Sequence, residues 1–80
     1  MALKEDVLNA IADILDVKVE ELVEDKKLYD SIGVDSTEIV ELVVSLGKRF
    51  NVKIAANEIT KFSTPLEITA LIEKKAPTGQ

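Results

Sequence analysis

The apolar residues of segment 36–50 recur at helical spacing, and this pattern constrains the fold more than any other feature of the chain. The stripe consists of Ile39, Leu42, Val43, Leu46 and Phe50, with Val40 and Val44 on its flank. Valine and isoleucine also suit β-strands, but a half-buried strand would alternate apolar and polar residues with a period of two. The spacing therefore predicts an amphipathic helix whose apolar face must be buried.

Polar residues mark both ends of this helix. Asp35 is a good N-cap, and Glu38 three residues later completes the pattern of a capping box. Lys48 and Arg49 lie in the last turn, where positive charge is favoured by the helix dipole. We therefore expect the helix to begin at residue 35 or 36 and to end near Phe50.

The N-terminal part predicts one long helix followed by a long connection. Residues 3–15 carry an apolar stripe of Leu3, Val7, Leu8, Ile11, Ile14 and Leu15. Segment 16–35 lacks a sustained helical period, although one helical turn at 20–23 is compatible with it. Its isolated apolar residues, expected to anchor the loop to the core, are Val17, Val19, Leu22, Leu28 and Ile32.

The C-terminal part predicts a short helix and a long one. Residues 56–62 allow two helical turns with Ile59 and Phe62 directed inward. Thr64, Pro65 and Glu67 form a start signal for the last helix. Its inward residues are Ile68, Leu71 and Ile72, and residues 76–80 should fray. The expected fold is all-α: a small four-helix bundle of three long helices and one short one, with a long loop between the first and second. It forms a single domain, 1–80, with its core in about residues 3–73.

Composition excludes several classes of chemistry. The 80 residues contain neither cysteine nor histidine, so disulfides, thiolate sites and histidine bases are absent. The net charge is −5, and residues 1–30 hold the whole acidic excess. Such a face repels nucleic acid and attracts basic partner proteins, although solubility alone would also explain it. With no signal-peptide-like or membrane-spanning stretch, we expect a cytoplasmic monomer without membrane insertion.

Two Asp-Ser pairs, Asp30-Ser31 and Asp35-Ser36, lie five residues apart. A serine nucleophile needs an activating base, and the chain has no histidine and no lysine near Ser36 in sequence. Gly33 is misplaced for a calcium-binding EF-hand loop, so no metal site is expected. A phosphate attached to Ser36 would lie at the positive end of a helix. Ser31 fits less well because Gly33 disfavours a helix running from it, so Asp30-Ser31 is expected in the loop. From these arguments alone, Ser36 is either an attachment point or an ordinary first-turn serine.

The surrounding segment, SIGVDSTEIVELVVSLGKRFNVKI, resembles the signature of acyl carrier proteins. Ile32-Gly33-Val34-Asp35-Ser36 is similar to the L-G-x-D-S approach, and Val40-Glu41-Leu42-Val43 to the V-E-L-V block of that family. The resemblance implies a protein that is not an enzyme. Ser36 would carry 4′-phosphopantetheine, installed from coenzyme A by a phosphopantetheinyl transferase, and the arm would hold acyl intermediates as thioesters.

The resemblance also implies residues that face partners and cargo. The expected partner-recognition residues are Asp35, Thr37, Glu38, Val40, Glu41, Lys48 and Arg49. The candidate acyl-chain residues, for each of which plain core packing is the favoured alternative, are Val7, Val43, Leu46, Ile54, Ile59, Phe62 and Leu71. Expected partners are the transferase, an acyl-activating ligase, a ketosynthase and other acyl-processing enzymes, in fatty acid or in specialised lipid or polyketide biosynthesis.

Three departures from the family pattern distinguish this chain: Thr37, Gly47-Lys48-Arg49, and Ala55-Ala56-Asn57. The first two predict a specialised carrier, because a basic helix end would weaken docking to a basic partner patch. The alternative is that Gly47 relieves crowding while Lys48 and Arg49 serve the helix end. Two further alternatives are an aminoacyl or peptidyl carrier, and an unmodified helical adaptor that binds proteins through its acidic first third.

Overall fold

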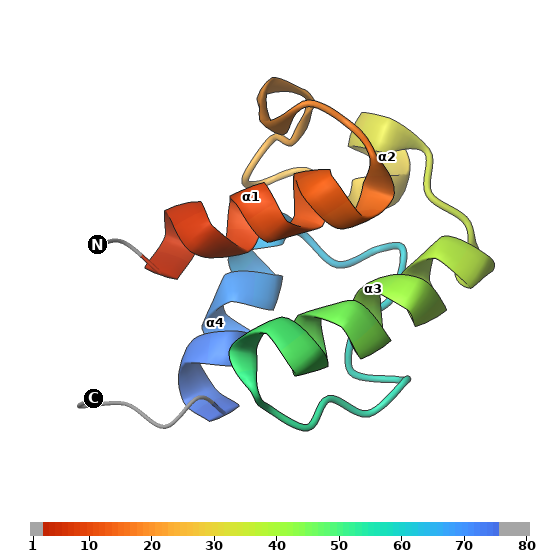
Figure 1. The fold of residues 1–80 in the computed structure, drawn as a ribbon. Coiled ribbons are helices and arrows are strands. Elements are labelled where there is room, and N and C mark those ends of the chain that lie inside the picture. Colours follow the sequence, from red (N-terminus) through yellow and green to blue (C-terminus); the bar gives the residue numbers. More distant parts are fainter. Residues whose placement is uncertain (1–2, 76–80) are drawn as a thin grey trace.

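A computed structural model describes residues 3–75 of the chain. Within that range it contains four α-helices, α1 (Leu3–Leu15), α2 (Leu28–Ile32), α3 (Ser36–Phe50) and α4 (Pro65–Lys75), and one 3₁₀ turn, η1 (Val19–Glu21) (Figure 1). The prediction of an all-α fold with three long helices and one short one is confirmed. No helix of the described part is long and apolar enough to cross a bilayer. The predicted fraying of 76–80 lies outside the described residues.

The three long helices enclose one core. α1 packs against both α3 and α4, as Figure 1 shows. Among the residues without exposed surface are Val7, Ile11, Leu42, Leu46 and Ile72. The predicted inner stripe of α3 is confirmed at Ile39, Leu42, Val43 and Leu46, while Phe50 is half-buried. Val40 and Val44 on its flank remain exposed.

The predicted short helix at 56–62 is wrong, because this segment forms successive turns. Its backbone amides bond to nearby side chains: the amide of Phe62 donates to the Thr60 hydroxyl over 3.1 Å, and that of Thr60 to the Ser63 hydroxyl over 3.0 Å. Such local bonds compete with a helical ladder. Ile59 is buried as expected, but Phe62 is 54% exposed and does not point inward.

The short helix lies instead at α2, inside the expected loop. Asp30 and Ser31 are therefore helical, which corrects their assignment to a loop. Gly33 ends this helix with φ = 69°, a left-handed conformation that glycine adopts without steric cost. The first amides of α2 are bonded from outside, since Leu28 N–H donates to the Ser63 carbonyl over 3.0 Å and Tyr29 N–H to the Lys61 carbonyl over 2.8 Å.

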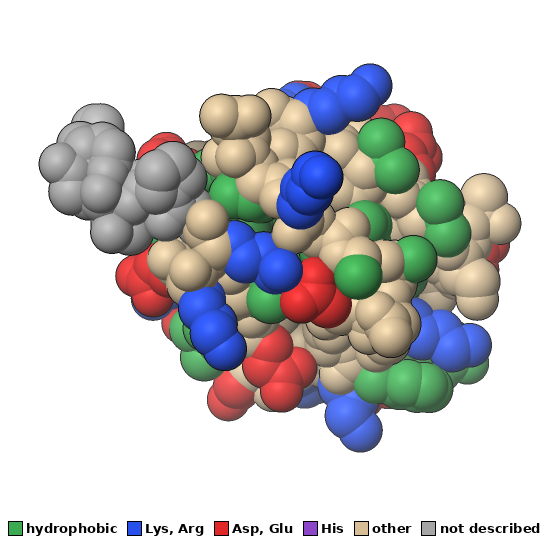
Figure 2. All heavy atoms as spheres, turned by 90° about the horizontal axis from the view of Figure 1, so that it is seen from below, with side chains coloured by type: hydrophobic (Ala, Val, Ile, Leu, Met, Phe, Trp, Pro, Cys, Tyr) green, Lys and Arg blue, Asp and Glu red, His purple; other side chains and the backbone are tan. Residues whose placement is uncertain are grey.

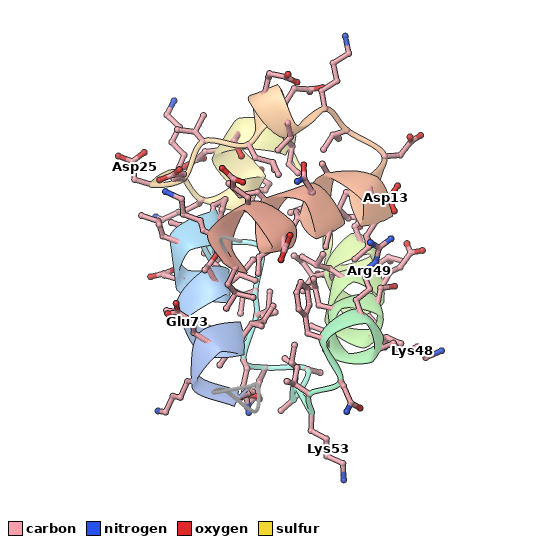
Figure 3. The ribbon with its side chains drawn as sticks, turned by 60° about the vertical axis from the view of Figure 1, so that its left-hand side comes forward. Asp13, Asp25, Lys48, Arg49, Lys53 and Glu73 are labelled. Carbon is pink, nitrogen blue, oxygen red and sulfur yellow. The ribbon has the colours of Figure 1, made fainter. Side chains whose placement is uncertain are left out.

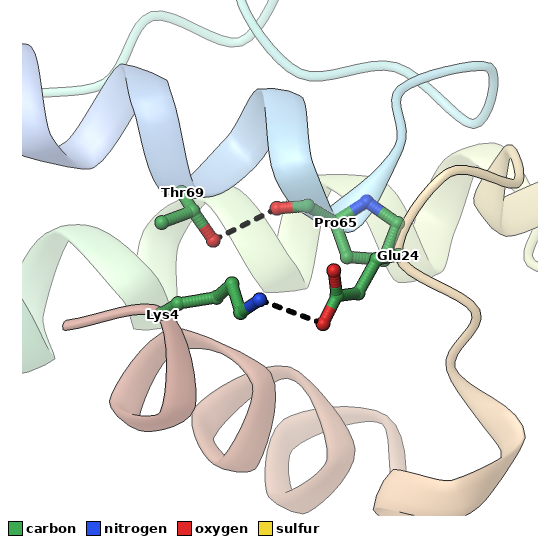
Figure 4. Close-up of polar contacts among 4 residues, drawn as sticks. All are labelled: Lys4, Glu24, Pro65 and Thr69. Carbon is green, nitrogen blue, oxygen red and sulfur yellow. Dashed lines mark hydrogen bonds and ion pairs between the residues drawn. The ribbon is translucent and has the colours of Figure 1, made fainter. Parts of the chain in front are cut away.

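Polar contacts fasten the connection 22–27 to α1 and α4. Lys4 Nζ lies 2.9 Å from a Glu24 carboxylate oxygen (Figure 4), and the Glu24 carbonyl accepts a hydrogen bond from Leu66 N–H at 3.2 Å. The expected apolar anchors also contribute, because Leu22 and Leu28 are buried while Val17, Val19 and Ile32 pack against the core. Thr64 and Glu67 form the predicted reciprocal cap at the start of α4.

Candidate attachment site at the start of α3

The first turn of α3 is fixed by a reciprocal cap. Asp35 is extended (φ −112°, ψ −179°), and its carboxylate accepts a hydrogen bond from Glu38 N–H over 2.9 Å. The Glu38 carboxylate in turn accepts from Asp35 N–H over 3.1 Å. The predicted capping box is therefore confirmed, and both carboxylates are engaged in shaping the helix start.

Ser36 is the first residue of α3, and its side chain is exposed. The amides of Glu38 and Ile39 bond to Asp35. Those of Ser36 and Thr37 have no hydrogen-bond partner within residues 3–75. Two free donors thus lie beside an accessible hydroxyl at the positive end of a helix, an arrangement that favours an attached phosphate.

Ser36 opens onto a groove of about 330 Å³ between α3 and the turns of 56–62. We call it the Ser36 groove. Its principal lining residues are Ser36, Ile39, Val40, Ile59, Lys61 and Phe62. Exposed apolar side chains at Val40 and Phe62 lie on its edges. The groove therefore offers an extended apolar group a surface that begins at the serine.

An aromatic and cationic cluster borders this groove and was not predicted. The rings of Tyr29 and Phe62 have centroids 6.1 Å apart, and the Lys61 ammonium lies 5.2 Å from the first and 5.6 Å from the second. Cation–π attraction holds Lys61 against both rings. No local pattern signals this cluster, because the contact joins α2 to a segment about 30 residues further along the chain.

The candidate cargo residues do not form one site. Ile59 and Phe62 line the Ser36 groove, whereas Val43 and Ile54 line a second, shallow pocket of about 770 Å³. Val7 and Leu46 are fully buried, and Leu71 packs half-buried against the same core. Whether any of them contacts an acyl chain stays a prediction.

The candidate partner residues separate in the structure. Thr37, Val40, Glu41 and Lys48 are exposed on α3, whereas the Arg49 guanidinium pairs with the Asp13 carboxylate of α1. Figure 3 shows Arg49 beside Asp13 while Lys48 projects away from the helix bundle. Residues 48 and 49, which are adjacent in sequence, therefore differ in role: Lys48 remains free within residues 3–75 while Arg49 joins two helices.

Gly47 allows the chain to turn back against α3. A Cβ at this position would lie 2.9 Å from the Val52 carbonyl oxygen, closer than a carbon side chain tolerates. The Val52 amide also donates to the Gly47 carbonyl over 2.9 Å. The interpretation that Gly47 relieves crowding is thus confirmed.

Comparison with known proteins agrees with this geometry. The phosphopantetheine attachment site family matches residues 5–72. An acyl carrier protein of Wolinella succinogenes is 34% identical over 73 residues, covering 91% of this chain and 96% of the relative. Acyl carrier proteins of Thermotoga maritima (33% over 79 residues, covering 94% and 98%) and of an Exiguobacterium species (34% over 70 residues, covering 88% and 89%) are also similar. The chain belongs to the acyl carrier protein family.

Acyl carrier proteins are carriers and not catalysts, and they interact with acyl-processing enzymes. Membership of this family implies a 4′-phosphopantetheine prosthetic group. The start of α3 fits such a group, because an exposed hydroxyl, two free amides and an apolar groove lie together there.

Proposed function

We propose that this acyl carrier protein is modified at Ser36 and delivers acyl groups in fatty acid biosynthesis or a specialised lipid or polyketide pathway. The observation that carries the proposal is the exposed Ser36 hydroxyl at the first position of α3, facing an apolar groove. When bound, 4′-phosphopantetheine supplies a terminal thiol that holds the acyl group as a thioester. A cytoplasmic location stays a prediction.

The chain's own residues position the attachment and supply no catalysis for it. Ser36 Oγ forms the phosphodiester with the phosphopantetheine phosphate as the phosphoanhydride bond of coenzyme A breaks and adenosine 3′,5′-bisphosphate leaves. We assign the hydroxyl proton to a base of the phosphopantetheinyl transferase, because this chain has no histidine and each cap carboxylate already accepts a hydrogen bond from a backbone amide. The amides of Ser36 and Thr37 favour the phosphate oxygens, and the cap holds these amides in place.

Intact mass after treatment with coenzyme A and a promiscuous transferase tests the proposal. The wild type should gain the mass of one phosphopantetheine group, Ser36→Ala should gain none, and Ser31→Ala should be modified like the wild type. Ser31→Ala is a matched control because its hydroxyl lies inside α2, five residues away. An unmodified wild type, or modification that follows Ser31, would contradict the proposal.

The class of cargo needs a second assay. Holo-protein incubated in parallel with an acyl-activating and an aminoacyl-activating ligase should accept the acyl group. A thioester formed only with the amino acid would instead identify an aminoacyl or peptidyl carrier.

A further inference from the structure

The second pocket lies at the C-terminal end of α3, and we call it the α3-end pocket. Its principal lining residues are Val43, Val44, Lys48, Val52, Lys53 and Ile54. Figure 2 views the molecule from below Figure 1, and on this face basic, acidic and apolar side chains are interspersed. The pocket is shallow and mostly apolar, with lysines at its margin.

Two of the lysines at this pocket carry charge that no described residue neutralises. Lys75 Nζ lies 3.1 Å from a Glu58 carboxylate oxygen, so the charges of these two side chains cancel. Lys48 and Lys53 form no ion pair within residues 3–75, and Figure 3 shows both projecting outward at the end of α3. The pocket therefore presents two positive charges in a chain whose net charge is −5.

The close approach at Gly47 brings these lysines to one place. The Val52 amide bonds to the Gly47 carbonyl, and this turn directs residues 52–54 back along α3. Lys53 thereby joins Lys48 at the same pocket although the two lie five positions apart in the sequence. A glycine that relieves crowding and a basic surface are thus two aspects of one structural feature.

An exposed apolar strip connects this pocket to the attachment site. Val40 is 55% exposed and lines the Ser36 groove, while Val44 is 53% exposed and lines the α3-end pocket. Lys48 lies twelve residues beyond Ser36, about 18 Å along the helix. An enzyme that receives a group from Ser36 and extends along α3 would therefore cover both valines and reach the lysines.

We propose that the face formed by Val40, Val44, Lys48 and Lys53 docks partner enzymes that present acidic side chains to the α3-end pocket. The proposal rests on the proposed function, because the partner is one that approaches Ser36. Charge complementarity selects acidic groups opposite Lys48 and Lys53. Arg49 takes no part, since Asp13 already neutralises it.

The shape of the face favours a protein surface over a bound cargo. A small-molecule site buries most of its ligand in a concave cavity, whereas this pocket is shallow and Val44 is half exposed. Exposed apolar side chains with charged residues at the margin are the anatomy of a protein–protein interface.

Transfer from the holo-protein to two matched enzymes tests the proposal. One is a fatty-acid ketosynthase with a basic docking surface, and the other is the same enzyme with those basic residues replaced by glutamate. Wild-type carrier should give roughly fivefold higher kcat/KM with the acidic enzyme, and Lys48→Glu with Lys53→Glu should reverse this preference. Raising the ionic strength should reduce the difference in kcat/KM between the two enzymes, both for the wild-type carrier and for the double variant.

A control variant separates local charge from net charge. Lys26→Glu with Lys74→Glu makes the same change at two exposed positions outside the pocket, and it should keep the wild-type preference. Equal turnover of the wild type by both enzymes, or a preference for the basic one, would overturn the proposal.

Two further outcomes identify what has failed. If the wild type gains no phosphopantetheine mass, the proposed function itself fails. The second outcome concerns cargo and uses carrier loaded with an acyl group that bears a distal carboxylate. If Lys48→Glu with Lys53→Glu lowers the thermal stability of this loaded carrier but leaves kcat/KM with both enzymes unchanged, the pocket holds cargo. The partner proposal is then overturned.

Discussion

Replacing Gly47 by alanine tests whether the close approach of residues 47 and 52 shapes the end of α3. In the interior of an unconstrained helix, this substitution stabilises by about 1 kcal/mol. Here the new Cβ would lie 2.9 Å from the Val52 carbonyl oxygen, a backbone atom that can retreat only with its chain. Overpacking costs about 1–3 kcal/mol, so we expect Gly47→Ala to lower the free energy of unfolding by about 1 kcal/mol.

Urea unfolding followed by circular dichroism measures this change. Ala70→Gly is the control, because it exchanges the same two residues at an exposed position of α4, where propensity alone should cost about 1 kcal/mol. Hydrogen exchange at the Val52 amide should also be faster in Gly47→Ala, because the new Cβ would strain the hydrogen bond from this amide to the carbonyl of residue 47. A more stable Gly47→Ala protein with an equally protected Val52 amide would refute the reasoning.

Three other substitutions test separate features. Ser31→Ala should raise the free energy of unfolding, measured in urea titrations, by about 0.5–1 kcal/mol. The reasons are that the buried Ser31 hydroxyl has no hydrogen-bond partner within residues 3–75 and that alanine favours a helix. A lower free energy of unfolding would show that the hydroxyl does have a partner. The Ala55 amide donates a hydrogen bond to the Glu58 carboxylate over 2.8 Å, and this bond holds the pKa of the carboxyl below its ordinary value of 4.5. The Lys75 ammonium has a smaller effect in the same direction. The stability that Glu58 contributes is thus complete above pH 4.5 and is lost as the pH falls through the lower, folded-state pKa. Glu58→Gln should therefore flatten the pH dependence of the free energy of unfolding in urea below about pH 5. An unchanged pH dependence would count against this role of Glu58. The side chains of Arg49 and Asp13 are 46% and 69% exposed. A double-mutant cycle of Arg49→Gln and Asp13→Asn should therefore give a coupling free energy of about 0.2–1 kcal/mol, which decreases as salt is added. A coupling that does not change with salt would contradict a surface ion pair.

The long helices could be predicted because their signals are local. The stripe of α3 and the caps at Asp35 and Thr64 depend on residues within one or two turns of each other. The short helix could not be placed in this way. Its first amides are satisfied by carbonyls of residues 61 and 63, far along the chain, so tertiary hydrogen bonds stabilise a five-residue helix that is marginal by itself.

The helix start that carries the candidate attachment site was predictable to the same extent. Ser36 follows the cap, and both the helix end and the family signature point to it. The surroundings of the serine were not predictable, because the Ser36 groove takes one wall from residues 56–62, whose turn conformation and exposed Phe62 differ from the helix that was expected. Site chemistry was thus encoded locally, whereas site shape depends on packing.

The same distinction explains why Lys48 and Arg49 could not be separated by sequence. Both suit the last turn of α3, and the helix dipole favours both equally. Only the packing of α1 beside α3 brings Asp13 to Arg49, while the turn at Gly47 brings Lys53 to the pocket of Lys48. A single basic residue pair in the sequence therefore becomes one interhelical contact and one half of the proposed basic docking surface. Substituting Arg49 should then affect stability more than partner choice, whereas substituting Lys48 should do the reverse.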